Sequence, residues 1–159
     1  FVHPSYAPCE LRREGATDWP FRTISFAASI TAPAPPVIVK TGTGTGYNYH
    51  YVVTAIASDL ISESAPSGAG TILNSNLYTS GTFHTISWVA VAGAAMYNVY
   101  REQGGLWAYI GQTTLTSIVD DNISPDASMC PPTYDAVFVG AGNYPAAVSY
   151  YEQRRCFAR

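Results

Sequence analysis

The feature that most constrains this chain is a stretch of alternating side chains from Ile86 to Arg101. It consists of two short runs joined by small residues, and in the first run Ile86, Trp88 and Ala90 share one face. The second run divides between two faces: Tyr97, Val99 and Arg101 on one, Asn98 and Tyr100 on the other. Side chains alternate across a strand, so the pattern predicts two strands of a β-sandwich, each with one buried and one solvent-exposed face. Trp88 is predicted to be a core residue.

The composition limits both the size of the fold and its partners. A chain of 159 residues that is 47% hydrophobic and 13% aromatic is long enough for one core with flanking pieces. Charged residues make up only 12%, and the net charge is -3. This balance excludes a basic surface for nucleic acid, phosphate or an anionic membrane. Abundant Thr, Ser, Gly, Ala and Tyr favour an all-β fold.

Membrane, targeting and disulfide signals are also missing from the sequence. No stretch approaches the roughly 20 apolar residues of a membrane span. The first residues contain neither an initiator Met nor a signal sequence, which is typical of a piece cut from a longer chain. The cysteines are odd in number and widely spaced: Cys9, Cys130 and Cys156. They argue against a disulfide framework and fit a reducing cytoplasm, although a single Cys9–Cys130 bridge stays open.

Proline-rich stretches divide the chain into three segments. The run Ala32-Pro-Ala-Pro-Pro36 reads as a semi-rigid connector, because prolines fix φ and cannot donate to a central ladder. We therefore expect a flanking segment at 1–32, a β-sandwich at 33–131 and a second flanking segment at 132–159. For Ala147–Ala158 two predictions remain open: a helix that starts near Pro145, and a hairpin that turns at Glu152-Gln153.

Parts of the middle segment resemble a fibronectin type III domain. The stretch Ile86–Arg101 resembles its second and third strands, and Gly104–Thr113 resembles the hairpin that follows. The strand at 47–57, with its continuation to Ser67, resembles the final hairpin, with Leu60-Ile61 in place of the usual Gly. The final strands therefore come first in this sequence.

The resemblance implies an all-β, fibronectin type III or immunoglobulin-like sandwich that is circularly permuted. In it, strands 47–57 and roughly 70–74 complete the sheet begun by 84–119. The alternative is two half-domains that pair with partners outside the chain. We favour permutation, because one chain then buries both halves of its own core.

Three further islands resemble tail proteins of short-tailed bacteriophages and related prophages. They are Val2–Arg12 with Trp19 and Ile24–Phe26, Asp121–Asp126 with Pro131-Pro132, and Gly142–Arg154. The last is the most specific, with the pattern Tyr-Pro-x-x-Val-x-Tyr-x-x-Gln-Arg. In nozzle-like members of that family a β-propeller body carries an inserted fibronectin-like domain. The resemblance implies that residues 1–30 and 142–159 are propeller sequence.

Motifs for metal or nucleophilic chemistry are not present. His3, His50 and His84 are not spaced with one another or with the cysteines as zinc ligands. The sequence contains no G-x-S-x-G elbow, and the Thr-Gly repeat at 41–46 precedes a strand rather than a helix. Four residues that could suggest calcium lack EF-hand spacing and are better explained as turn formers: Asp120, Asp121, Asn122 and Asp126.

Carboxylate and aromatic patterns do not indicate an enzyme either. The glutamates are scattered over loops and termini without a converging pair: Glu10, Glu14, Glu63, Glu102 and Glu152. Tyr78, Trp107 and Tyr109 are of a type that stacks on sugars, although packing and subunit contact explain such residues more often. We therefore predict no catalytic, metal-binding or cofactor-binding residue.

The resemblance and the missing motifs together predict a non-enzymatic structural domain of a phage tail protein. Such a viral protein is made in the bacterial host cytoplasm and resides in the tail of the virion. Its expected partners are copies of itself in a ring, other tail proteins and host-surface glycan. We expect no nucleic-acid-specific site and no membrane insertion. The alternative function is an extracellular fibronectin-like module that binds carbohydrate or spaces a glycosidase.

Overall fold

The computed structural model describes residues 1–133, 138 and 140–159. Residues 134–137 and 139, within the predicted flanking segment 132–159, lie outside the described part. The described residues form strands and no helix, so none of them forms a helix that could cross a membrane. The prediction of an all-β chain is confirmed. The strands are β1 (Cys9–Leu11), β2 (Phe21–Thr23), β3 (Val37–Thr41), β4 (Tyr47–Ala57), β5 (Gly70–Ser75), β6 (Phe83–Ser87), β7 (Ala94–Gln103), β8 (Leu106–Thr113), β9 (Ser117–Asp120), β10 (Ala147–Tyr151) and β11 (Arg154–Ala158).

The chain divides into two compact units. Unit 1 combines the two ends of the sequence, Phe1–Ala27 and Asp135–Arg159, and unit 2 is the continuous middle, Ala28–Tyr134. The sequence predicts boundaries after residues 32 and 131. Ile30 lies inside the predicted flanking segment, but its side chain is buried in the core of unit 2.

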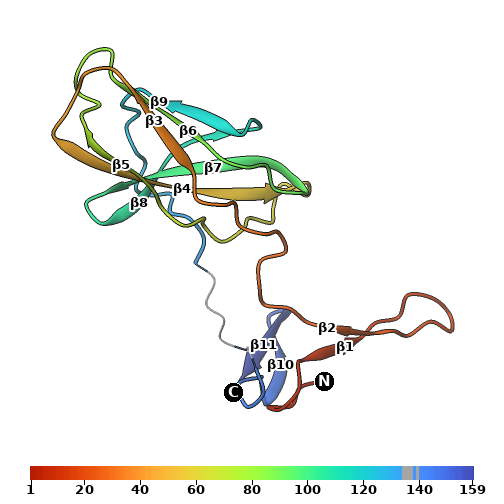
Figure 1. Ribbon diagram of the computed structural model, residues 1–159. Helices are drawn as coiled ribbons and strands as arrows, with labels where there is room; N and C mark the ends of the chain where they lie inside the picture. Colours follow the sequence, from red (N-terminus) through yellow and green to blue (C-terminus); the bar gives the residue numbers. More distant parts are fainter. Residues whose placement is uncertain (134–137, 139) are drawn as a thin grey trace. The chain divides into compact units, whose positions relative to one another are not determined.

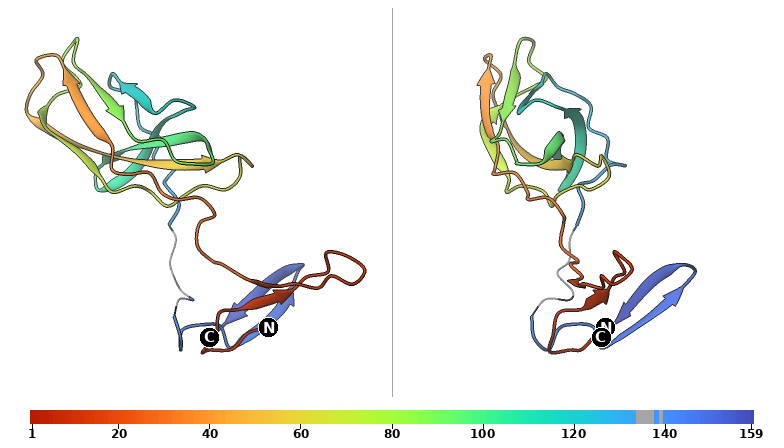
Figure 2. Two further views of the ribbon diagram at one scale, coloured as in Figure 1. Left: turned by 45° about the vertical axis from the view of Figure 1, so that its right-hand side comes forward. Right: turned by 90° about the vertical axis from the view of Figure 1, so that its right-hand side faces the viewer.

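Unit 2 consists of two antiparallel sheets that lie face to face (Figures 1 and 2). One sheet has the order β3-β6-β9, and the other has the order β5-β4-β7-β8. The central pairing joins β4 to β7, with a register from Tyr51 opposite Arg101 to Ala57 opposite Ala94. Two strands that come early in the sequence therefore share a sheet with β7 and β8.

The core of unit 2 lies between the two sheets. Ile86 and Trp88 enter it from the β6 side, while Tyr51, Val53 and Val99 enter it from β4 and β7. Trp88 is only 7% exposed, so its predicted place in the core is confirmed. Tyr51, Val53 and Ala55 of β4 all reach the core, because alternate residues of a strand face the same side.

The prediction of a solvent-exposed second face for β7 is wrong. Asn98 and Tyr100 are buried, as are their neighbours on the opposite face. The physical reason is that Glu63, from the segment after β4, accepts hydrogen bonds from Asn98 Nδ2 at 3.1 Å and from Tyr100 OH at 3.0 Å. Polar side chains can be buried on this face because a carboxylate satisfies them.

Ser64 and Ser67 form hydrogen bonds with the backbone of the part of β4 that does not pair with β5. The backbone N–H of Val53 donates to Ser67 Oγ at 3.0 Å, and that of Ala55 donates to Ser64 Oγ at 2.9 Å. The backbone N–H groups of Ser67 and Ser64 donate in turn to the carbonyl oxygens of Val53 and Ala55. This segment contains Pro66, which cannot donate, and the serine hydroxyls accept the hydrogen bonds of the β4 N–H groups.

Unit 1 contains two antiparallel hairpins, β1 with β2 and β10 with β11. The hairpin prediction for the tail is confirmed, and the alternative of a helix near Pro145 is wrong. Glu152 and Gln153 form the turn with φ of 47° and 62°. Positive φ at both central residues is the geometry of a two-residue turn that matches strand twist. The β-branched and aromatic residues of β10 favour a strand over a helix.

Candidate functional site

A polar network is buried between the sheets of unit 2. His84 lies at its centre: Nε2 is 2.7 Å from Ser75 Oγ, and Nδ1 is 2.7 Å from the hydroxyl of Tyr51. Tyr51 OH donates to Asp120 Oδ2 at 2.9 Å, and Arg101 Nη1 donates to the same oxygen at 2.6 Å. These residues come from five different strands, and Ser75, His84, Tyr51 and Asp120 have no exposed surface.

The hydrogen bonds of this network determine its protonation. Because the Tyr51 hydroxyl donates its proton to Asp120, His84 Nδ1 must carry the hydrogen and Nε2 must accept from Ser75. Burial lowers the pKa of His84, which favours the neutral ring. Burial raises the pKa of Tyr51 well above its usual range, and the negative charge of Asp120 raises it further.

The chain of hydrogen bonds from Ser75 through His84 and Tyr51 to Asp120 resembles a Ser-His-Asp catalytic triad with a tyrosine inserted before the aspartate. A working relay requires a hydroxyl that substrate can reach. Ser75 Oγ has no access to solvent, and no motif exposes it at the surface. The arrangement therefore holds a buried ion pair in place and offers no route to acyl transfer.

Two of the three aspartates named above as turn formers, Asp120 and Asp126, accept hydrogen bonds from within the chain. Asp120 Oδ1 accepts the backbone N–H groups of Asn122 and Ile123 at 3.0 and 2.9 Å. Asp126 Oδ1 accepts the hydroxyl and the backbone N–H of Ser128, and these hydrogen bonds lower the pKa of Asp126. Within the residues that the structure describes, no group of three His, Cys, Asp or Glu side chains could hold a metal ion.

A second polar cluster lies on the outer face of β4 and β7. Glu63 Oε1 accepts hydrogen bonds from Thr54, Asn98 and Tyr100, and Gln112 Nε2 donates to Asn98 Oδ1. Burial raises the pKa of Tyr100, and the negative charge of Glu63 raises it further. The polar side chains of Thr54, Asn98 and Tyr100 on this face therefore all have hydrogen-bond partners.

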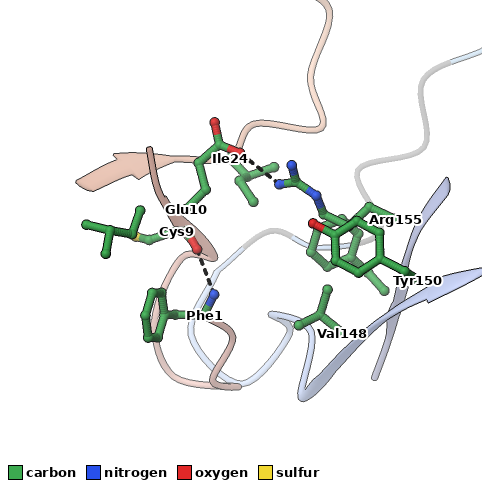
Figure 3. A pocket seen from close by; sticks show the side chains of 9 residues that line it. Phe1, Cys9, Glu10, Ile24, Val148, Tyr150 and Arg155 are labelled. Carbon is green, nitrogen blue, oxygen red and sulfur yellow. Dashed lines mark hydrogen bonds and ion pairs between the residues drawn. The ribbon is translucent and has the colours of Figure 1, made fainter. Parts of the chain in front are cut away.

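Unit 1 contains a mostly apolar, open pocket of about 360 Å³ (Figure 3). Its lining comes from the chain start, β1, the residue after β2, β10 and β11: Phe1, Cys9, Glu10, Leu11, Ile24, Val148, Tyr150, Arg155 and Phe157. Glu10 Oε2 and Arg155 Nη1 form an ion pair of 2.9 Å beside it. Cys9 Sγ donates to the carbonyl oxygen of Ala7, and the three cysteines of the chain are free thiols.

The other residues considered from sequence are dispersed. His3 Nδ1 accepts the backbone N–H of Ser5, and His50 Nδ1 lies 2.9 Å from Thr71 Oγ1. Glu14 forms an ion pair with Arg22 at 2.7 Å.

Among the aromatic residues considered, Tyr78 is exposed and Trp107 is half-buried. Tyr109 is also half-buried and packs against the ring of Tyr100 at 5.9 Å between centroids. The sequence pattern did not predict that the ring of Tyr78 lies against that of Tyr47, with centroids 6.4 Å apart.

One signal of the buried network was visible in the sequence. Arg101 falls on the predicted inward face with Tyr97 and Val99, and a buried guanidinium requires a buried anion. Which carboxylate supplies that anion, Asp120 of β9, depends on tertiary structure.

Comparisons with protein-family models, with curated proteins and with solved structures found no match.

Proposed function

We propose that this chain is a non-enzymatic structural part of a phage or prophage tail protein. Unit 2 is a permuted fibronectin type III-like sandwich inserted into the sequence of a larger β-propeller body, to which unit 1 belongs. The protein assembles as a ring in the virion tail and contacts neighbouring subunits, other tail proteins or the host surface.

The observation that carries the proposal is the composition of unit 1 from both ends of the sequence. Arg155 Nη1 donates to Glu10 Oε2 at 2.9 Å, and the N–H of Gly142 donates to the carbonyl of Pro4 at 2.7 Å. The ring of Phe157 packs against that of Phe26 at 5.1 Å between centroids. Segments more than a hundred residues apart thus make one unit around a continuous insertion.

The exposed strands and apolar side chains of unit 1 support the proposal that it belongs to a larger β-propeller body. Each of its hairpins has only two strands, and every residue of β10 is exposed. Large apolar side chains such as Tyr150 and Phe21 are among the exposed ones. Two-stranded hairpins are marginal alone and gain stability from further strands or a covering layer. A propeller supplies such strands, since its blades are four-stranded sheets.

The strand order of unit 2 supports a permuted sandwich. β4 and β5 correspond to the segments that resemble the last two strands of a fibronectin type III domain. They precede β6 to β9 in sequence, but they join the sheet of β7 and β8. One chain buries both halves of its own core in this arrangement, as the permutation requires.

Electron microscopy of the parent tail protein that contains this chain tests the proposal. We expect a closed ring with one projection per subunit, because cyclic closure builds a tube section from copies of one chain. Replacing 28–133 by a short Gly-Ser linker should preserve the ring and remove the projections. A monomeric parent whose glycan affinity depends on Trp107 would support the alternative of an extracellular carbohydrate-binding module.

A further inference from the structure

The side chain of His84 joins β6 to β5 of the opposite sheet. β5 stands at the edge of its sheet beside β4, whereas β6 lies between β3 and β9. Ser75, the last residue of β5, has its hydroxyl oxygen 2.7 Å from His84 Nε2, and neither residue has exposed surface. This hydrogen bond therefore ties the two sheets together at an edge strand.

A second proton on the His84 ring would disturb this hydrogen bond. In the neutral ring Nδ1 carries the hydrogen, because the Tyr51 hydroxyl that it meets donates its own proton to Asp120. Nε2 is then the acceptor for the Ser75 hydroxyl. Protonation turns Nε2 into a donor, so the buried Ser75 hydroxyl loses the acceptor of its hydrogen. Leaving a buried donor without an acceptor is unfavourable.

Charged and titratable groups face His84 from four strands: Lys40 of β3, Tyr49 and Tyr51 of β4, Arg101 of β7 and Asp120 of β9. Burial lowers the pKa of His84; the charge of Asp120 opposes that shift, and those of Arg101 and Lys40 add to it. The Asp120 carboxylate already accepts four N–H and O–H donors. An imidazolium here would thus be a buried cation without an anion to bind it directly.

Separation of β5 from β4 is the opening that exposes Nε2 with the least loss of strand pairing. β5 pairs with β4 only between Tyr47 and Tyr51, and a β-bulge interrupts that pairing. Movement of β6 would instead break its pairing with both β3 and β9. Opening at β5 also breaks the hydrogen bond from Lys40 Nζ to the Asn74 carbonyl, a cost that does not involve His84. Water then hydrates the imidazolium and the Ser75 hydroxyl.

We propose that β5 is an acid-responsive edge of unit 2, which separates from β4 when His84 takes up a proton while β4 and β7 stay paired. In mild acid the edge of β4 between Tyr47 and Tyr51 then becomes accessible without unfolding of the sandwich. This device lies within unit 2 and goes beyond the proposed tail function, on which it does not depend.

Native-state hydrogen exchange of the full 159-residue chain tests the proposal. The backbone amides of β5 should exchange through an opening that depends less on urea than the unfolding that exposes β7, because it uncovers less surface. The equilibrium constant of that opening should rise by up to about tenfold between about pH 7.5 and about pH 5.5, because one proton is bound on opening. Ring ¹⁵N shifts at the higher pH should place the hydrogen of His84 on Nδ1.

Two histidine variants separate the candidate proton acceptors. His84→Gln should remove the acid dependence of β5 exchange. His50→Gln is the matched control and should retain it, although His50 also touches β5. His50 is half-buried, with Nδ1 2.9 Å from Thr71 Oγ1 and Nε2 4.0 Å from Glu102.

The wild-type chain alone can overturn the proposal. It fails if the β5 amides exchange with the same protection and urea dependence as those of β7, because His84 is then released only by global unfolding. It also fails if the β5 opening is local but independent of pH. Acid dependence that disappears in His50→Gln and persists in His84→Gln would assign the proton to the outer face of the sheet.

Discussion

At the scale of single residues, the core of unit 2 combines apolar packing with one buried ion pair. The ring of Trp88 packs edge-on against Tyr97 with centroids 5.3 Å apart, and its Nε1 has no hydrogen-bond partner among the described residues. Arg101 and Asp120 pair at 2.6 Å in the same core. Packing around the indole is therefore the source of its stabilisation, while the charges depend on each other.

Replacing Trp88 by Ala should lower the free energy of unfolding of unit 2 by about 3–5 kcal/mol, because a large buried ring leaves a cavity. Chemical denaturation followed by far-UV circular dichroism measures the change. Trp19→Ala, at an exposed position in unit 1, is the control and should cost under about 1 kcal/mol. An equally small cost at Trp88 would contradict its role in the core.

Neutral His84 should make unit 2 less stable in mild acid. Burial lowers the pKa of the folded-state imidazole below the ordinary value of 6.5, so the unfolded chain binds the proton more readily. Stability should therefore be constant above pH 7 and fall as the pH drops below 6.5, by at most about 1.4 kcal/mol per pH unit for this group. Denaturant melts from pH 5 to 8, a range of about three units around the histidine pKa, measure the slope. His84→Gln should flatten it, and an unchanged slope in that variant would assign the effect elsewhere.

At the scale of elements, two turns place residues other than glycine at positive φ. The turn after β4 places Leu60 at a φ of 57°, and the β10–β11 turn places Glu152 and Gln153 at positive φ. Left-handed backbone costs an L-residue about 1–2 kcal/mol. Asp59 offsets part of this cost in the first turn, since its Oδ1 accepts the N–H groups of Ile61 and Ser62.

Replacing Leu60 by Gly should stabilise unit 2 by about 0.5–1 kcal/mol, because glycine adopts positive φ without the steric penalty. Leu106→Gly is the matched control: both leucines are 61% exposed, but Leu106 is in β8 and has no positive φ. That control should destabilise the protein, since glycine weakens a strand. Thermal melts of the two variants measure the difference, and destabilisation by both would contradict strain at Leu60.

At the scale of the whole chain, the hydrophobic core cluster lies in unit 2. Unit 2 contains the three-stranded and four-stranded sheets with the hydrophobic core between them, whereas unit 1 is built from two short hairpins. The core of unit 2 also includes Ile30, from the segment before the proline-rich connector. The segment 126–129 returns to the edge of β8, where Asp126 and Tyr109 exchange backbone hydrogen bonds.

The fragment 28–134 should unfold cooperatively without unit 1, because it contains the complete core. The shorter fragment 33–131 lacks Ile30 and should be less stable by about 2–5 kcal/mol, the usual cost of removing a buried isoleucine side chain. Urea denaturation of both fragments tests this, with Ile30→Ala in the full chain as the comparison. Equal stability of the two fragments would show that Ile30 adds nothing to the core. We also expect the trimmed fragments to lose any weak self-association of the full chain, which analytical ultracentrifugation measures.

The identity of the strands was readable from the sequence, because side-chain alternation is a local property. The runs at 47–57, 86–88 and 97–101 predicted strands, and the inward positions of Trp88 and Val99 followed from period two alone. The tail hairpin was one of two local alternatives. Turn geometry at Glu152-Gln153 decided between them.

Tertiary structure decided which faces are covered and which polar groups meet. Burial of Asn98 depends on Glu63, 35 residues earlier, and the buried charge of Arg101 depends on Asp120 in the opposite sheet. Asn48 Oδ1 accepts the N–H of Asn74 because β4 and β5 pair at this end of the sheet. Local patterns determined which residues form strands and which strand face is apolar. Only the folded chain brings together groups far apart in sequence, because their contacts arise after loops are closed and sheets are packed.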